Sequence, residues 1–500
     1  MSGNLSRLID SFAGLDVLVI GDAMLDSYLE GTASGLCREA PVPVVALAGR
    51  VDVPGGAANT AANLRALGGR VRLLSVVGDD PEAGLLRRAL DRYGVGIEDV
   101  LTQPGRRTLA KQRVVASSQV LVRFDQGSSE PIDQAAEAAL IERLAELFHS
   151  CDAAIISDYS YGVLTPRVIR AIGLLQSGSP RVLVADSRRL AAYSRVGVTA
   201  VKPNYREAIE LLGDRPPVED RGRVDWVAAR GEQLLELTGA QIAAVTLDAD
   251  GALVVERGSS PYRTYARRAH NAQPAGAGDT FLSALTLALA AGADTPSAGE
   301  LASAAAAIVV GKQGTATCSG DELRAAISAD GKYSRDLDRL VALVELYRQQ
   351  GRRVVFTNGC FDILHRGHVT YLSRAKALGD VLIVGVNGDA GVRRLKGPTR
   401  PINTLEDRAQ VLAALSCVDH LVAFDEETPI RLIRALRPDV FVKGGDYTRE
   451  KLPEAPVVEA LGGVVYILPY LQDRSTTGII ERIRAANAEP RQRTAGESYR

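Results

Sequence analysis

Two of the five histidines in the 500-residue chain are three positions apart in the stretch TNGCFDILHRGHVTYLSRAKALGD, residues 357–380. The apolar runs 354–356 and 381–386 on either side predict strands, so His365 and His368 lie where a strand turns into a helix. Imidazoles beside a helix N-terminus can donate hydrogen bonds to phosphate oxygens whose negative charge grows during transfer. Their types and spacing therefore favour phosphate chemistry.

A metal site and a space-filling role are the alternatives for this histidine pair. A zinc site needs a third and a fourth ligand at suitable spacing. His420 is 52 positions beyond His368, although Asp362 could contribute a ligand. Gly367 leaves room for a nucleotide to lie close to the backbone. We therefore favour phosphate binding and expect no structural zinc.

The stretch PAGAGDTFLSALTLALAAG, residues 274–292, has the pattern of an anion-binding turn followed by a helix. Gly276, Ala277 and Gly278 lead directly into the apolar segment, so backbone N–H groups and the helix N-terminus can face an anion. Asp279 in the first turn could accept a proton from an attacking hydroxyl. It could also only cap the helix, and the turn by itself does not separate these two roles.

Further polar side chains lie near predicted strand ends and helix starts. Gly55 and Gly56 precede a predicted helix in the stretch VPGGAANTAANLRALG, residues 53–68, and Asn59 within it could contact hydroxyl groups. Asp22 follows the first predicted strand, which is where open α/β sheets bind ligands.

A third segment completes the pattern of the first half. Asn204 and Glu207 are three residues apart after a predicted strand and suit the ordering of Mg²⁺ through water. The chain contains no GxxxxGK[ST] motif, so it is not a P-loop kinase. The GG pair, the NxxE segment and the GAGD turn, in this order, resemble the ribokinase-like (PfkB) family of sugar kinases over about residues 10–325.

The PfkB resemblance implies a role for each of these residues. Asp279 would be the general base, and Gly276–Gly278 would form the anion hole. Asn204 and Glu207 would lie near Mg·ATP, with Glu207 reaching the metal through water. The residues that would contact the sugar are Asp22, Gly55, Gly56, Asn59 and Lys111.

Residues 359–368, GCFDILHRGH, match the pattern GxFDxxHxGH and resemble the cytidylyltransferase-like nucleotidyltransferase superfamily. The resemblance implies that His365 and His368 are catalytic. It also implies nucleotide contacts from Gly359, Phe361, Asp362 and Gly367, and, where a late Ser-Thr-rich segment meets the triphosphate, from Ser475, Thr476 and Thr477.

Lysines near glycines supply candidate phosphate clamps in the second half. Lys396 precedes Gly397 and is predicted to be a catalytic clamp in a mobile loop, with a solvated surface loop as the alternative. Lys443 precedes a Gly pair and is a weaker candidate, and Arg400 is also available.

The elements that must position these residues form two series. Short β-branched runs alternate with helical segments, which predicts largely parallel sheets covered on both faces. The series restarts after the charged helical segment 334–353, which places a boundary near Gly320–Arg335. We expect a ribokinase-like α/β/α domain at 1–325, a connecting helix or linker at 326–350, a Rossmann-like HxGH nucleotidyltransferase domain at 351–486 and a disordered tail at 487–500.

The combination resembles the bifunctional heptose 7-phosphate kinase and heptose 1-phosphate adenylyltransferase family across nearly the whole chain. It implies ATP-dependent phosphorylation of the 7-phosphate sugar at O1, and adenylyl transfer from ATP to the 1-phosphate sugar, which gives ADP-heptose, a lipopolysaccharide core precursor, and pyrophosphate. Mg²⁺, ATP as substrate and a homodimer are expected with it. One departure concerns Gly35, where the family usually carries a basic residue; if that residue touches the sugar phosphate, Arg38 would have to compensate.

Composition narrows the classes of function. The net charge of −1 does not favour nucleic-acid binding, and no run reaches the roughly 18 apolar residues of a membrane span. Five cysteines without a CxxC pair and no signal-peptide pattern predict a cytoplasmic protein with reduced thiols that acts on small molecules. One alternative keeps both chemistries with another sugar phosphate or with CTP or GTP. A remote one is a non-catalytic sugar or nucleotide sensor, which would tend to lose Asp279, His365 or His368.

Overall fold

The computed structural model describes residues 2–116, 119–213, 222–265, 275–312, 314–327, 332–334, 336–445 and 448–469. The chain forms two compact units, one of Gly3–Ala326 and one of Ile327–Arg500 together with Met1–Ser2. The tail predicted at 487–500 and the candidate residues Ser475, Thr476 and Thr477 lie outside the described residues.

A nine-stranded sheet forms the centre of the first unit, in the order β13-β12-β11-β10-β9-β8-β1-β4-β5. The parallel strands are β1 (Asp16–Gly21), β4 (Arg70–Val77), β5 (Val100–Thr102), β8 (Ala153–Asp158), β9 (Val182–Ser187), β10 (Ala200–Val201) and β11 (Ile242–Thr246). Antiparallel β12 (Ala252–Glu256) and β13 (Tyr262–Thr264) extend the sheet at one edge. Every residue of β8 is buried, which explains the continuous apolar run in its sequence.

Helices cover this sheet on both faces, so the predicted α/β class is confirmed. Helices α4 (Gln134–Ser150) and α5 (Pro166–Gly178) pack on one side, where Leu144 and Phe148 share a core with Ile20. Helices α2 (Ala57–Ala66), α9 (Ala277–Ala290) and α10 (Thr295–Val310) pack against one another. The other helices are α1 (Ser2–Ser11), α3 (Pro81–Arg92), α6 (Tyr205–Leu212), α7 (Arg223–Ala228), α8 (Gly231–Thr238) and α11 (Gly320–Ile327).

Helix α9 explains one of the longest apolar stretches of the sequence. Every residue from Asp279 to Ala288 is buried, because the helix is enclosed by α2, α10 and the strands β8 and β9. Such a helix is apolar on all sides for packing reasons. Within the described part of the chain, no helix is long and apolar enough to cross a membrane.

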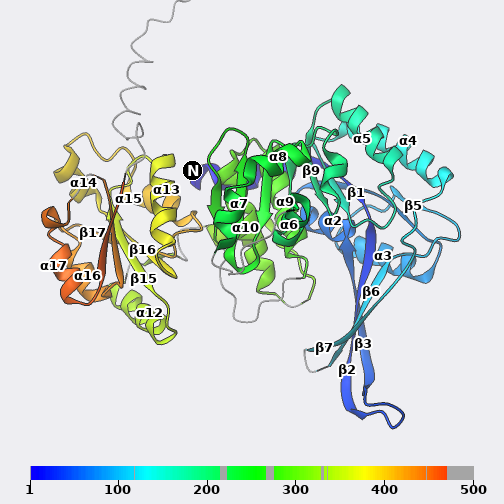
Figure 1. The fold of residues 1–500 in the computed structure, drawn as a ribbon, viewed down its shortest axis with the longest axis horizontal. Coiled ribbons are helices and arrows are strands. Elements are labelled where there is room, and N and C mark those ends of the chain that lie inside the picture. Colours follow the sequence, from blue (N-terminus) through cyan, green and yellow to red (C-terminus); the bar gives the residue numbers. More distant parts are fainter. Residues whose placement is uncertain are drawn as a thin grey trace, which may run out of the picture. The chain divides into compact units, whose positions relative to one another are not determined.

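A second, four-stranded sheet of the first unit was not predicted from the sequence. Its order is β3-β2-β6-β7, and we refer to it as the side sheet. Its strands are β2 (Ala23–Leu36), β3 (Pro43–Gly56), β6 (Ala110–Ala116) and β7 (Gln119–Gln126). Figure 1 shows the long hairpin of β2 and β3 projecting from the unit, and the hairpin tip carries Gly35.

The second unit is built around a six-stranded parallel sheet in the order β14-β17-β16-β15-β18-β19. Its strands are β14 (Tyr333–Ser334), β15 (Val354–Gly359), β16 (Val381–Asn387), β17 (His420–Phe424), β18 (Val440–Gly444) and β19 (Val464–Leu468). Its helices are α12 (Leu337–Gln349), α13 (Arg366–Lys376), α14 (Asp389–Lys396), α15 (Leu405–Ala413), α16 (Ile430–Leu436) and α17 (Ala455–Ala460).

The segment predicted as a connecting helix or linker, 326–350, has a different place in the structure. Helix α12 packs on the sheet of the second unit, where Leu340 and Val344 are each 1% exposed and share a core with Phe356. Strand β14 pairs with β17. Leu340 and Val344 are four residues apart and form the core-facing stripe of this helix. The segment predicted as a connecting helix or linker thus contains a helix that packs in the core of the second unit.

Candidate active sites

The GAGD turn of the first unit lies at the start of α9. Gly276 has a φ of 83° and is the N-cap residue of the helix. A Cβ there would lie 3.0 Å from the amide nitrogen of Asn59 and 3.3 Å from a methyl of Thr315, so both the backbone conformation and the space favour glycine. A Cβ on Gly278 would lie 3.5 Å from the ammonium of Lys202, which is an ordinary van der Waals contact.

Asp279 lies at the centre of a hydrogen-bond network that joins several elements. Asn59 of α2 donates to one carboxylate oxygen at 2.6 Å, and Tyr159, just after β8, donates to the other at 2.9 Å. Thr60 donates to the second oxygen at 3.4 Å. These bonds come from other elements, which argues against a simple helix-capping role for Asp279.

Burial gives Asp279 the protonation behaviour of a general base. Its side chain is nearly enclosed, and burial raises the pKa of Asp279 to about 6. Hydrogen bonds from Asn59 and Tyr159 oppose this increase in pKa because they stabilise the charged carboxylate, and Asp186 adds to it by repulsion. The carboxylate is therefore ionised at neutral pH and has a higher proton affinity than an exposed one.

Asn59 and Asp22, which are predicted to contact the sugar, both have hydrogen-bond partners within the protein. Both ends of the Asn59 amide are occupied, because its nitrogen donates to Asp279 and its oxygen accepts from Asn63 at 3.2 Å. Asp22 is fully buried, and its carboxylate accepts the backbone N–H groups of Tyr159, Tyr161 and Val163 at 2.9, 3.1 and 3.2 Å. Asn59 thus orients the base, and Asp22 holds the loop that carries Tyr159.

The predicted glycine pair lies beside this loop. A Cβ on Gly56, which has a φ of 56°, would lie 2.6 Å from the carbonyl oxygen of Asp22 and 3.3 Å from the Tyr159 ring. A Cβ on Gly55 would lie 2.8 Å from a carboxylate oxygen of Asp26. The two glycines therefore allow β3 to pass close to the backbone of Asp22 and to the carboxylate of Asp26.

Asn204 and Glu207 form a reciprocal cap at the start of α6. The Asn204 side chain accepts the N–H of Glu207, and the Glu207 carboxylate accepts the N–H of Asn204, both at 2.9 Å. This capping box accounts for their spacing in structural terms. Burial raises the pKa of Glu207, and Asp186 and Lys202 interact with it electrostatically, so it belongs to the charged surroundings of Asp279.

Sequence reasoning missed several residues of this site. Lys202 is 5% exposed, and its ammonium lies 3.0 Å from the carboxylate of Asp186 at the end of β9. Tyr159 donates to the base, and Asp26 on β2 forms an ion pair with Arg113 at 2.8 Å. The signal for Asp186 and Lys202 was their position at strand ends, but only the fold brings those ends together.

Lys111 lies on β6, with its ammonium 5.4 Å from the ring centre of Tyr159. Gly35 is far from Lys111. Lys111 pairs with Asp26 of β2, and Gly35 lies nine residues further along β2, which is about 30 Å of strand. A basic side chain at position 35 would not reach a sugar bound beside Lys111 in the same chain. Within one chain, Gly35 therefore lies outside the surroundings of Lys111.

In the second unit, His365 and His368 lie together at the start of α13, as predicted. Their ring centres are 3.9 Å apart in a stacked arrangement. The Gly367 N–H donates to Nδ1 of His365 at 3.1 Å, so this nitrogen is an acceptor and the ring proton is on Nε2. Burial and the neighbouring His365 lower the pKa of His368 to about 4, which keeps this imidazole neutral at physiological pH.

Phe361 and Asp362, which are predicted to contact the nucleotide, are both packed within the histidine loop region. Phe361 is buried, with its ring centre 5.4 Å from that of His368, and a Cβ on Gly359 would lie 3.0 Å from the Phe361 ring. Asp362 is 3% exposed and forms an ion pair with Arg400. Its carboxylate also accepts the N–H groups of Ile402 and Asn403 at 2.7 and 3.0 Å. These contacts fix the conformation of the loop, and nucleotide contact from the two residues stays a prediction.

A buried arginine that the sequence did not single out holds this region together. Arg408 of α15 is 1% exposed. Its guanidinium donates to the carbonyl of Cys360 at 2.6 Å, to the carbonyl of Asn403 at 3.1 Å and to the carboxylate of Asp389 at 2.8 Å. It thereby ties the histidine loop to the start of α14, the helix that ends at Lys396.

The two candidate clamp lysines differ in their surroundings. Lys396 is the last residue of α14, not a loop residue, and its side chain is exposed. Burial raises the pKa of the Cys360 thiol, and the nearby charge of Lys396 opposes that increase. The ammonium of Lys443 lies 2.9 Å from Asn358 and 3.7 Å from Glu454. Lys396 is therefore better placed to meet a ligand at the histidine loop.

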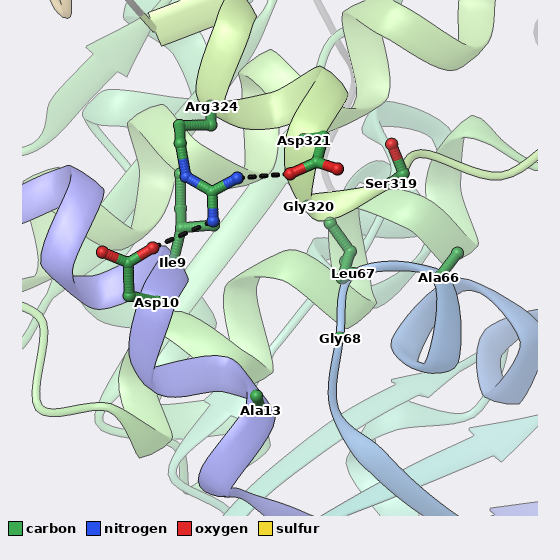
Figure 2. Close-up of a pocket in the computed structure, with 10 residues that line it drawn as sticks. All are labelled: Ile9, Asp10, Ala13, Ala66, Leu67, Gly68, Ser319, Gly320, Asp321 and Arg324. Atoms are coloured by element: carbon green, nitrogen blue, oxygen red, sulfur yellow. Dashed lines mark hydrogen bonds and ion pairs between the residues drawn. The ribbon is translucent and has the colours of Figure 1, made fainter.

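Two further features bear on what the sites can bind. Among the described residues, no group of three or more His, Cys, Asp or Glu side chains is arranged to hold a metal ion. A surface pocket of the first unit lies between α1, the end of α2 and the start of α11 (Figure 2), with Arg324 paired to Asp10 at 2.9 Å and to Asp321 at 2.5 Å. None of the predicted kinase residues lines that pocket, so it is separate from the site at Asp279.

Comparison with known proteins decides the family. The profile of the pfkB family carbohydrate kinases matches residues 15–322, and the cytidylyltransferase-like profile matches residues 356–482. Two proteins named Bifunctional protein HldE, from Geobacter metallireducens and Caulobacter vibrioides, are 41% and 42% identical to the chain over 493 and 492 residues. The alignments cover 97% of this chain and 99% and 100% of those proteins. The chain belongs to the bifunctional HldE family.

HldE-family membership confirms the predicted enzyme class: a sugar kinase joined to a nucleotidyltransferase in one chain. Solved structures support the fold of the first unit. Two crystal structures of phosphofructokinase-2 from Escherichia coli, one with potassium and one with substrates and products, match 62% of this chain and 97% of theirs. Their TM-scores are 0.52 and 0.51, each at 20% identity, which shows a shared ribokinase-like fold.

Proposed function

We propose that the chain carries out two steps on the way to ADP-heptose. The first unit phosphorylates heptose 7-phosphate at O1 with ATP, and the second joins heptose 1-phosphate to AMP from ATP and releases pyrophosphate. The observation that carries the proposal is the presence of both sites, the Asp279 network and the stacked histidine pair, in a chain that aligns with Bifunctional protein HldE over 97% of its length.

In the kinase step, Asp279 accepts the proton of the O1 hydroxyl as that oxygen attacks the γ-phosphorus of ATP. The new O–P bond forms as the bond to the β-phosphate oxygen breaks, and ADP leaves. Asn59 and Tyr159 hold the carboxylate in place. The N–H groups at Gly276, Ala277 and Gly278 form the anion hole at the start of α9.

Mg²⁺ is the metal that we propose for this step. Glu207 fits it, because its carboxylate is a hard oxygen donor and the capping box uses only one of its two oxygens, Oε2. Glu207 would hold the ion through water, with Asn204 beside it. When bound, the ion would neutralise negative charge on the phosphates of ATP.

In the adenylyl step, an oxygen of the sugar 1-phosphate attacks the α-phosphorus of ATP, and pyrophosphate leaves. In this proposal, the Nε2–H of His365 and the neutral ring of His368 donate to phosphate oxygens as the charge on those oxygens grows. Lys396 contributes a positive charge beside the loop. We propose that Gly359 and Gly367 allow the nucleotide to approach the backbone, and that Ser475, Thr476 and Thr477 contact the triphosphate.

The decisive experiment supplies each half-reaction separately to the purified full-length chain. ADP formation from heptose 7-phosphate and ATP tests the kinase step, and pyrophosphate release from heptose 1-phosphate tests the adenylyl step with ATP, CTP and GTP in parallel. We expect both activities, with ATP preferred in the second. Activity with CTP or GTP in place of ATP would refute the adenylyl assignment, and failure with both heptose phosphates would refute the substrate.

We also propose that the enzyme is a cytoplasmic homodimer. Several large apolar side chains are exposed on the side sheet, among them Leu47, Val51, Val120, Val122 and Phe124, at 43–58% of their surface. A second copy of the chain would bury them, because exposed apolar patches mark interaction surfaces. Light scattering should give a dimer mass that Val122→Glu reduces, whereas Leu174→Glu on α5, also exposed, should leave it unchanged.

A further inference from the structure

Two positively charged side chains meet at one aromatic ring beside the kinase base. The ammonium of Lys111 lies 5.8 Å from the ring centre of Tyr161, and the guanidinium carbon of Arg188 lies 6.0 Å from the same centre. The backbone that carries the ring is held in place, because the N–H groups of Tyr159 and Tyr161 both donate to Asp22. The geometry at Tyr161 is therefore set by the fold.

Neither of these cations forms an ion pair among the described residues, although Glu207 is close enough to Arg188 to interact with it electrostatically. Two carboxylates are close enough to Lys111 to act on its pKa, those of Asp26 and Asp125. Each is already paired with an arginine, Asp26 with Arg113 at 2.8 Å and Asp125 with Arg123 at 3.0 Å. Lys111 and Arg188 are left as two positive charges in the same region, and burial lowers the pKa of Lys111.

This excess positive charge lies a short distance from the reacting end of the substrate. Tyr159 links the two places, because its hydroxyl donates to Asp279 at 2.9 Å and its ring centre is 5.4 Å from the Lys111 ammonium. In a sugar whose O1 faces Asp279, the C7 end lies beyond the opposite side of the sugar ring. In heptose 7-phosphate that end is a phosphate monoester dianion.

We propose that Lys111 and Arg188 bind this distal phosphate of the kinase substrate. The inference rests on the proposed function for the position of O1, and it names the residues that select a phosphorylated over an unphosphorylated sugar. Lys111 belongs to β6 of the side sheet, whereas Arg188 directly follows β9 of the central sheet. A dianion held by both would draw the side sheet towards the central sheet over the bound sugar.

The test compares one sugar with and without its phosphate. Arg188→Ala and Lys111→Ala should each lower kcat/KM for heptose 7-phosphate about 10- to 100-fold, mainly through KM, because each removes a charge-assisted hydrogen bond. The same variants should lower kcat/KM for unphosphorylated heptose much less, so the preference for the phosphorylated sugar should fall. Arg188→Lys should recover part of the loss. Arg195→Ala, an exposed arginine of the same region, is the matched control and should behave as wild type.

Calorimetric binding of heptose 7-phosphate without ATP separates this inference from the proposed function. Binding that weakens in both alanine variants supports the phosphate site even where turnover is absent, and absent turnover in the wild type refutes only the proposed function. Equal losses for both sugars would show a structural role and overturn the inference. Unchanged binding of heptose 7-phosphate in either alanine variant, or no binding to the wild type, would overturn it as well.

Discussion

The two active sites of this chain are assembled in different ways. In the kinase unit, the carboxylate of Asp279 is held by Asn59 and Tyr159, which are 220 and 120 positions away in the sequence. In the nucleotidyltransferase unit, His365 and His368 lie on one short segment and stack 3.9 Å apart. One site depends on long-range contacts and the other on a contiguous motif with a distant support, Arg408.

The same physical cause, burial, acts in opposite directions on the two sites. It raises the pKa of Asp279 to about 6 and lowers the pKa of His368 to about 4, because burial disfavours the charged form of either group. Asp279 can therefore collect a proton near neutral pH, whereas His368 stays a neutral hydrogen-bond donor. Burial can therefore prepare a carboxylate to accept a proton at one site and keep an imidazole neutral at the other.

The largest expected effect tests whether the kinase site depends on a single base. Asp279→Asn keeps the size of the side chain but removes the proton acceptor, so phosphorylation should slow by roughly 10²–10⁴-fold. Adenylyl transfer from supplied heptose 1-phosphate should persist, which serves as the internal control. Near-normal kinase turnover in this variant would refute the assignment of the base.

The histidine pair should show the next largest effect. His368→Ala removes a donor to a developing oxyanion, which should cost about 3–4 kcal/mol, or two to three powers of ten in turnover, with a smaller change in the KM for ATP. Kinase activity should not change. Elemental analysis of wild type and variant completes the test: near one equivalent of zinc in the wild type, lost in His368→Ala, would replace the phosphate role with a metal site.

The distant support of the histidine site should appear as a loss of stability. Arg408→Met leaves Asp389 and two backbone carbonyls without their partner, so the free energy of unfolding of the second unit should fall by about 3 kcal/mol. Chemical denaturation followed through both activities measures this. Arg434→Met, an exposed arginine of α16, is the control and should have little effect. An unchanged midpoint in Arg408→Met would contradict the role of this arginine.

The smallest expected effect concerns pH. Because the pKa of Asp279 is about 6, acidification below pH 6 protonates the base, and kinase kcat/KM should fall about tenfold by pH 5. His368, with a pKa of about 4, should remain neutral over the same range. Tyr159→Phe removes a hydrogen bond that lowers the pKa of Asp279, so the acid limb of the kinase profile should move to higher pH. A limb that moves to lower pH would contradict the network.

The sequence was most informative where the chemistry is contiguous. The GAGD turn and the HxGH segment were located correctly at helix starts, because backbone conformation and helix capping are local properties. Asp362 shows the limit of this reasoning: it belongs to the motif, but its carboxylate is occupied by Arg400 and by the backbone at Ile402 and Asn403. A motif gives the residue but not its hydrogen-bond partners.

By itself, the sequence determined the two α/β units, their order and the residues of the two motifs, since hydrophobic periodicity and glycine positions are written along the chain. Tertiary structure alone decided that α12 belongs to a core, that Asn59 orients the base, and that Lys111 and Arg188 meet at Tyr161. The physical reason is that parallel strands bring their ends together regardless of separation in sequence. Contacts between such ends depend on strand order and register, which no local pattern encodes.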